Sequence, residues 1–235
     1  MTDETPPEYP LLPVLLDGAE KTFANAEQLF NEAQILARAG ATSRALLLHQ
    51  ISLEECSQID SLGAWGTSLV MGMEVDQKKV LSALIHHKAK NRLNAYMLDV
   101  SEAELEARAS GDWEKASGLF RQTQAEFHAS SNDAKNASLY VDWVDGAFVS
   151  PAERITGEML NEIAERNATF LGFASTNLHA LRGLVAAPDS RKSLMTGFIE
   201  EAQKLKDEQP ADMAERLNAL LSDLLEKGVA MENKE

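Results

Sequence analysis

The 235-residue chain is poor in the residues that build disulfides, sheets and membrane spans. It has one cysteine, Cys56, so neither an internal disulfide nor a Cys/His zinc set can be assembled. Aromatic residues make up 6% of the chain, and no apolar run approaches the roughly 18 residues of a membrane span. P-loop, GxGxxG, HExxH and GxSxG motifs are absent as well. We therefore expect no metal, no cofactor and no membrane association.

Positive charge is also scarce, since 37 acidic residues outnumber 22 Lys and Arg and give a formal net charge of -15. This balance argues against non-specific binding of DNA, which depends on clustered cations. The N-terminal segment Met1–Pro7 is acidic and proline-rich, without the basic start and apolar core of a signal peptide. We expect a cytoplasmic protein.

Hydrophobic residues, mainly aliphatic, make up 44% of the chain. They recur at spacings of three and four, the period of an amphipathic helix, and no strand pattern of any strength is present. We predict an all-α helical bundle with additional C-terminal helices. The predicted helices cover about 19–39, 43–62, 75–98, 101–131 with a break near 111, 132 or 133 to before 146, 151–185 with a possible restart at 156, 188–206 and 210–228. Capping boxes are predicted at Ser101–Glu104 and Ser150–Glu153, and Gly63, Gly66 and Gly72 are expected to loosen the chain.

These helices suggest three parts. Residues 1–17 carry four prolines and are expected to be an extended lead-in. Residues 18–185 form the predicted helical domain, in which the helix over 43–62 is apolar nearly all round and therefore central. Residues 186–235 are predicted to pack on this bundle or extend it.

The most informative stretch is Lys135–Asp142, which puts a cation, an amide, a phenol and a carboxylate on about two turns of a predicted helix. Positions four apart share a face, so Asn136 is expected under Tyr140, with Lys135 about two turns from Asp142. A structural alternative is an amphipathic helix that buries the aromatic residues of this stretch.

A second candidate is the acidic pair Glu54 and Glu55 inside the most apolar helix. Glu55 shares a face with Ile51 and Ile59 and is expected to point inward, whereas Glu54 is expected to face solvent. A buried carboxylate needs a cation or hydrogen-bond donor, and the pair is either a structural ion pair or a functional site.

The basic run His86–Lys90 offers partners for such a carboxylate. His87 or Lys88 can turn inward from the third helix and hold an anion or transfer a proton; alternatively, the run is a solvated basic face. We predict one polar cluster that contains Glu55, Lys135 and Tyr140 together with His87 and Lys90.

Taken together, these motifs resemble the AbiV family of abortive-infection proteins, a branch of the HEPN superfamily. The resemblance covers about residues 18–185 and rests on the order of short segments: Ala24-Asn25-Ala26, Arg44-Ala45-Leu46 running into Glu54-Glu55, His87-Lys88-Ala89-Lys90, Lys135 to Asp142, and Ser150-Pro151-Ala152-Glu153. It implies a HEPN-like helical bundle, a homodimer and a role in phage defence.

The resemblance also names candidate catalytic residues, because HEPN ribonucleases carry an RNxxxH signature. Lys135 stands in the place of its arginine, Asn136 in that of its asparagine and Tyr140 in that of its histidine. A tyrosine with a pKa near 10 is a poor general base at neutral pH. The expected function is therefore defence by binding a phage or host protein. A metal-independent ribonuclease acting on RNA and a purely structural helical scaffold are the alternatives.

Overall fold

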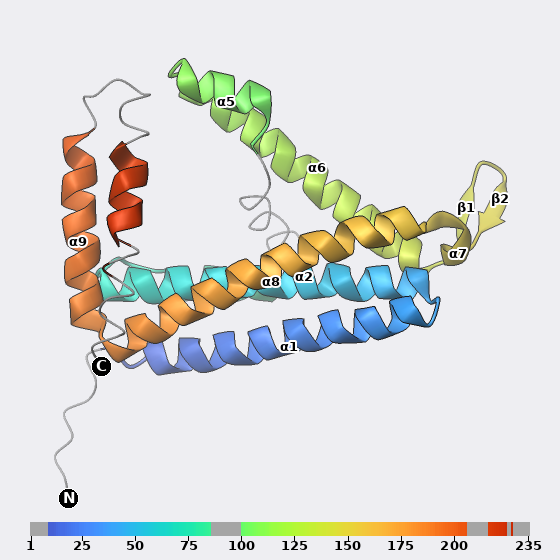
Figure 1. Ribbon diagram of the computed structural model, residues 1–235, viewed down its shortest axis with the longest axis horizontal. Coiled ribbons are helices and arrows are strands. Elements are labelled where there is room, and N and C mark those ends of the chain that lie inside the picture. The colour runs from blue at the N-terminus through green and yellow to red at the C-terminus, as the bar shows by residue number, and fades with distance from the viewer. Residues whose placement is uncertain (1–8, 86–99, 206–215, 225–226, 228–235) are drawn as a thin grey trace, which may run out of the picture.

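The computed structural model describes residues 9–85, 100–205, 216–224 and 227, and it confirms the predicted all-α class. Three long helices lie along one another: α1 (Leu12–Arg38), α2 (Thr42–Val70) and α8 (Gly157–Ala186) (Figure 1). The apolar stripes of these helices face one another and form the core.

Helix α2 is central, as predicted, because it packs against α1, α8 and α6. It runs on for eight residues past the predicted end at Leu62, so the expected loosening at Gly63 and Gly66 is wrong. A Cβ on Gly66 would lie 3.1 Å from the Leu181 side chain, so glycine lets α8 approach the α2 backbone closely. The helix ends before Gly72, which has a φ of +70°.

The predicted lead-in is too long, because α1 already begins at Leu12. Leu12 and Leu15 are buried in the core, with exposures of 2% and 4%. Pro13 lies in the first turn, where its missing N–H has no intrahelical acceptor to satisfy. Proline content therefore marks the start of a helix here. Residues 1–8 lie outside the described residues.

The middle of the chain contains α3 (Gln77–Ile85), α5 (Glu102–Ala109) and α6 (Trp113–Leu139). The hydroxyl of Ser101 caps α5 as predicted by accepting the Glu104 backbone N–H at 3.2 Å. The predicted break near residue 111 is also confirmed, because α5 ends at Ala109 and α6 begins at Trp113.

Helix α6 differs from the prediction in both length and end. It passes through Asn132 and Asp133 without interruption, so neither residue caps a separate helix. It ends at Leu139, and the chain then forms a hairpin of strands β1 (Asp142–Val144) and β2 (Ala147–Val149).

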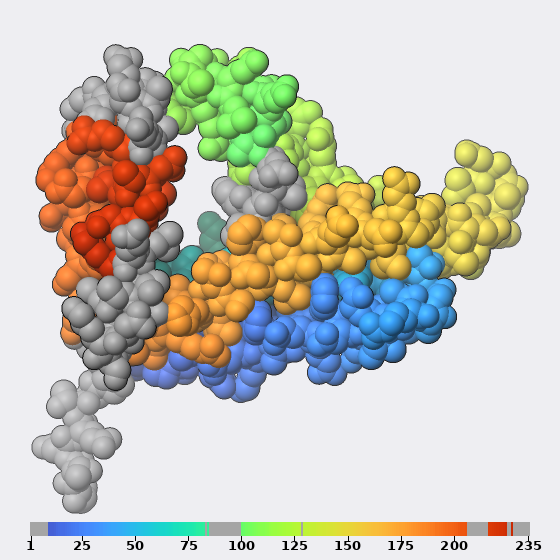
Figure 2. All heavy atoms as spheres, in the orientation of Figure 1, coloured from blue at the N-terminus to red at the C-terminus, as the bar shows by residue number. Residues whose placement is uncertain are grey.

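The hairpin corrects the expectation that the chain has no strand. Its turn is Asp145-Gly146, with φ of 48° and 90°, and such Asp-Gly pairs favour two-residue hairpin turns. The hairpin protrudes from the end of the molecule where α6 meets α8 (Figure 2).

The C-terminal part follows the predicted boundaries closely. Ser150 and Glu153 form the expected capping box of α7 (Pro151–Arg154), and Thr156 caps α8 through the Met159 N–H at 3.2 Å. Helix α9 (Pro188–Lys204) starts at its proline and crosses the end of the bundle (Figure 1). In the described residues, no helix is long and apolar enough to cross a membrane.

Candidate functional site

The charged centre of the molecule is an ion pair between α2 and α6. Lys135 Nζ donates to Glu54 Oε1 at 2.7 Å, and the exposed fractions of the two side chains are 13% and 1%. At this burial each charge depends on the other, because either ion alone in the core would be strongly destabilising. The first residue of the predicted motif is therefore bound inside the bundle.

The acidic residue in this pair is not the expected one. Glu54 is buried, whereas Glu55 is half-buried and accepts hydrogen bonds from Asn25 at 3.1 Å and from Gln58. Helix α2 is covered on most sides, so its apolar pattern does not distinguish an inner from an outer face. The carboxylate that binds Lys135 is therefore Glu54, and the predicted cluster around Glu55 stays a prediction.

The other two motif residues point away from the ion pair. Asn136 is exposed, and Tyr140 is 58% exposed. Tyr140 lies past the end of α6 in extended conformation, and its backbone N–H donates to the Asn136 carbonyl at 3.0 Å. The expected stacking of the Tyr140 side chain over Asn136 on one helical face is therefore wrong.

The C-terminal end of α6 is bound by Arg44, which lies in the first turn of α2. The Arg44 guanidinium donates to the carbonyl oxygens of Ser138 at 2.7 Å and Leu139 at 3.4 Å. These carbonyls have no intrahelical partner, and a cation at a helix C-terminus is favourable. Arg44 thus fixes the point at which the motif helix stops.

A buried polar network lies beside the ion pair on α2. Asn167 of α8 donates through Nδ2 to His49 Nδ1 at 3.1 Å, and its Oδ1 lies 3.2 Å from the Ser52 hydroxyl. Ser52 in turn donates to the Ala26 carbonyl of α1 at 2.7 Å. Burial lowers the pKa of His49 to about 4, so the imidazole is neutral at pH 7. The network ties three helices together.

The hairpin next to the motif has an exposed aromatic surface. Trp143 and Phe148 face each other across the strands with ring centroids 4.9 Å apart, and 64% and 73% of these residues are exposed. We call this exposed aromatic pair the hairpin face; Tyr140, Val141 and Val144, which are close to it in sequence, are exposed as well. Asp142, a predicted site residue, forms an ion pair with Arg154.

Several predicted residues remain without a structural test. His87, Lys88 and Lys90 lie outside the described residues. Among the described residues, no group of His, Cys, Asp and Glu is placed to hold a metal. Sequence reasoning missed the His49–Asn167 bond and the hairpin face; only the Asp145-Gly146 turn signal pointed to the latter.

Chemically, the described arrangement separates the parts of the motif. Transfer of a proton during RNA cleavage needs a base within hydrogen-bond reach of the reacting group and a cation beside the phosphate. Here the Lys135 ammonium is bound to a buried carboxylate, and Tyr140 is exposed between the end of α6 and the hairpin. The arrangement suits helix packing in the interior and contact formation outside.

Comparison with known proteins gives two matches. A family model of HEPN AbiV proteins, described as AbiV, matches residues 14–172. The uncharacterized protein y4gJ of Sinorhizobium fredii is 55% identical over 120 residues, which are 51% of this chain and 62% of that protein. This chain therefore covers less than two thirds of that relative. No solved structure matches the chain.

Proposed function

Because this chain belongs to the AbiV family of HEPN proteins, we propose that it acts in abortive infection by binding a phage or host protein, and that growth arrest follows from this binding. The proposal rests on where the structure places the two motif residues Lys135 and Tyr140. Lys135 is bound to Glu54 in the interior, and Tyr140 stands in the histidine place on the outside. A ribonuclease needs both groups at one phosphate.

The hairpin face is the contact surface that we propose. Aromatic residues are enriched in the energetic centres of protein interfaces, and two exposed aromatic side chains, Trp143 and Phe148, lie against each other here. Aromatic side chains also stack on RNA bases, but RNA binding depends on nearby cations. Beside the hairpin face, Arg154 is paired with Asp142, and the turn adds Asp145. Protein therefore fits this surface better than RNA.

We propose in addition that the protein is a homodimer. The expectation comes from the HEPN resemblance, in which motif helices of two copies face each other. In an isologous interface both copies use the same surface, so every contact occurs twice, once on each side of the two-fold axis. Sedimentation at micromolar concentration is expected to give twice the 25.7 kDa chain mass. A species of the single-chain mass throughout would contradict this.

The binding proposal is tested by phage challenge of cells that carry the wild type or the Trp143→Ser, Phe148→Ser double variant. We expect the double variant to lose protection while it accumulates normally. Trp113→Ser is the matched control, because Trp113 is 55% exposed at the opposite end of α6. Cellular RNA is followed in parallel. Protection that persists in the double variant, or RNA cleavage that precedes arrest, would contradict the proposal.

A further inference from the structure

The hairpin of β1 and β2 is a sheet of two strands that protrudes from the molecule (Figure 2). Within the part of the chain that the structure describes, no third strand pairs with it. A two-stranded hairpin alone is marginally stable in water, whereas three strands with an apolar face are stable. A strand supplied by another protein would therefore complete this sheet.

The register of the hairpin determines which backbone groups point outward. The paired residues are Asp142 with Val149, Trp143 with Phe148, and Val144 with Ala147. Val144 and Ala147 flank the two-residue turn and therefore exchange both hydrogen bonds, and bonded and non-bonded pairs alternate along an antiparallel ladder. Trp143 and Phe148 thus form the non-bonded pair. Their backbone N–H and C=O groups point to the two outer edges of the hairpin.

The two edges differ in the next outward position. Beside β2 this position is Ser150, whose N–H donates to Glu153 Oε2 at 2.8 Å and whose carbonyl accepts the Glu153 N–H at 3.1 Å. The capping box of α7 therefore occupies that edge. Beside β1 the chain is already extended at Tyr140, and Val141 is 60% exposed, with no backbone hydrogen bond to any described residue. Val141 and Trp143 form an open edge, which we call the β1 edge.

The side chains next to the β1 edge are aromatic. The Trp143 and Phe148 rings contact each other and are largely exposed. Successive side chains of an added strand alternate between the two faces of the sheet, so every second one would lie on the side of these rings. Apolar side chains at those positions would cover the hairpin face. The composition of the face therefore fits an extended segment with apolar residues at alternate positions.

The charge around the hairpin is negative. Asp142 is paired with Arg154, and Glu153 accepts hydrogen bonds from Ser150. Asp145 of the turn is exposed and has no ion-pair partner among the described residues. A cation in the added strand would be attracted to Asp145, whereas a second copy of this chain would bring another net charge of -15 to the edge. The charge therefore favours a basic segment of a different protein.

We propose that the β1 edge binds an extended, basic segment of the partner protein by strand addition. The backbone groups of Val141 and Trp143 bond to the main chain of the segment, its alternate apolar side chains lie on the hairpin face, and its cations lie near Asp145. Main-chain bonds supply affinity in such complexes, and the alternate side chains supply specificity. The inference rests on the proposed function, because it specifies how the hairpin face holds its protein partner.

The probe is a hexapeptide of alternating lysine and valine, titrated into the full chain while amide hydrogen exchange is followed by NMR. We expect bound peptide to slow exchange of the Trp143 N–H roughly tenfold or more and to leave the Phe148 N–H, on the other edge, unchanged. Only every second peptide N–H faces the β1 edge. Methylation of one alternate set of peptide nitrogens should therefore abolish binding, and methylation of the other set should not. A hexapeptide of alternating glutamate and valine is the charge control and should not bind.

Asp145→Asn tests the charge, because Asn-Gly preserves the hairpin turn. Peptide affinity should fall roughly threefold, and its dependence on salt should weaken. Asp189→Asn is the matched control, since Asp189 is exposed in the first turn of α9, at the other end of the bundle (Figure 1). Its peptide affinity should equal that of the wild type.

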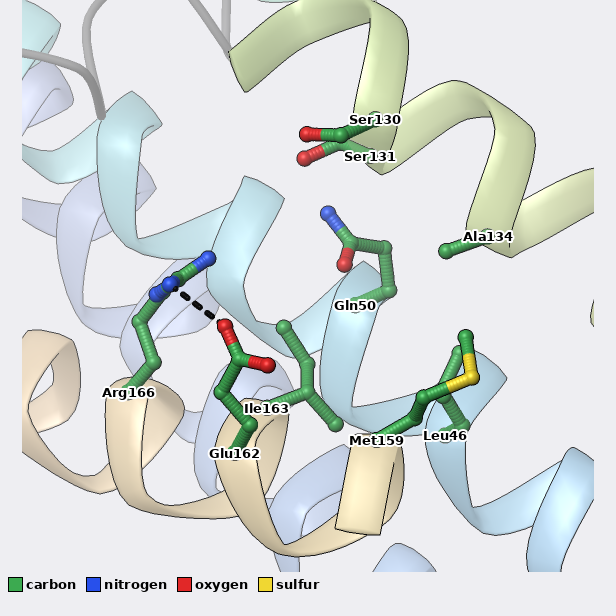
Figure 3. Close-up of a pocket in the computed structure, with 9 residues that line it drawn as sticks. All are labelled: Leu46, Gln50, Ser130, Ser131, Ala134, Met159, Glu162, Ile163 and Arg166. Atoms are coloured by element: carbon green, nitrogen blue, oxygen red, sulfur yellow. Dashed lines mark hydrogen bonds and ion pairs between the residues drawn. The ribbon is translucent and has the colours of Figure 1, made fainter. Parts of the chain in front are cut away.

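A pocket between α2, α6 and α8 is an alternative place for an apolar peptide side chain (Figure 3). Its wall includes Leu46, Met159 and Ile163, and Ala134 lies on its α6 side. Ala134→Leu narrows this pocket without changing the hairpin, so peptide binding should be unaffected. Loss of binding in this variant would place the peptide in the pocket and overturn the proposal.

Four other results would overturn strand addition: no peptide binding, equal slowing of the Trp143 and Phe148 amides, equal binding of the two methylated peptides, or slowed Trp143 exchange at high protein concentration without peptide, which would place a second copy at the edge. If any of these occurs while the Trp143→Ser, Phe148→Ser variant loses phage protection, the hairpin binds its partner through side chains alone and the proposed function stands. Protection that persists in the double variant contradicts the proposed function itself.

Discussion

The centre of α2 and the hairpin face each carry side chains that are unusual for their location. The helix centre is buried but polar, with Glu54, His49 and Ser52 each at 1% exposure or less. The hairpin face is exposed but aromatic, with Trp143 and Phe148 largely in solvent. Buried polar groups must be satisfied internally, whereas exposed apolar patches commonly mark interaction sites. The difference supports the proposal that the interior polar groups stabilise the fold and that the hairpin face forms contacts.

The largest effect is expected at the buried ion pair. Lys135→Met leaves Glu54 without the cation at 2.7 Å and should lower the free energy of unfolding by about 3–5 kcal/mol. Urea unfolding measures it. Glu54→Gln in the same chain should recover most of the loss. Lys21→Met is the control, because its pair with Asp17 is exposed and should contribute within about 0.5 kcal/mol. If Lys135→Met and Lys21→Met lowered the free energy of unfolding equally, the buried ion pair would not differ from an exposed one, which would contradict this account.

A smaller effect is expected from His49, which folding keeps neutral. Its pKa falls from 6.5 to about 4, so the unfolded chain binds this proton more readily. Stability from this group is present above pH 6.5 and is lost as the pH falls toward 4. Between pH 7 and pH 5 the loss is about 2 kcal/mol. His49→Gln should flatten this part of the pH profile of urea unfolding, whereas His179→Gln, on the exposed side of α8, should not.

The hairpin face should contribute little to stability. Trp143→Ser removes one cross-strand pair, and such pairs contribute about 0.2–1 kcal/mol. The melting temperature should therefore fall only slightly, while protection against phage is lost. A large drop in melting temperature would show that the aromatic side chains serve folding and would weaken the contact role.

The smallest effect concerns the single thiol. Burial, together with the nearby Asp60 carboxylate, raises the pKa of Cys56 to about 12. The reactive thiolate is therefore scarce at pH 7, and we expect a thiol reagent to label the folded protein much more slowly than the urea-unfolded chain. Equal labelling rates would indicate that the core around α2 opens readily.

Local signals predicted much of this fold. The central position of the helix over 43–62, the caps at Ser101 and Ser150 and the restart at Thr156 are confirmed, because each depends on neighbouring residues alone. The hairpin was also within reach, since Asp145-Gly146 is a local turn signal that the apolar pattern obscured.

The candidate site was less predictable, because its contacts are distant in sequence. Lys135 meets Glu54 across 81 positions, and Asn167 meets His49 across 118. The choice between Glu54 and Glu55 depends on which helix covers which side of α2, and an all-round apolar pattern does not contain that information. Tyr140 was misplaced because α6 ends at Leu139, where the terminal carbonyl accepts a hydrogen bond from Arg44, a residue 95 positions away.

The central claim is that the protein arrests growth by binding and not by cutting RNA, and the most direct test is RNA cleavage by the purified protein with a chelator present. The wild type, Tyr140→Phe and Tyr140→His are compared. The account predicts that all three are inert, because Lys135 stays bound to Glu54 even when a histidine replaces the tyrosine. Robust metal-independent cleavage by the wild type that Tyr140→Phe abolishes would contradict it.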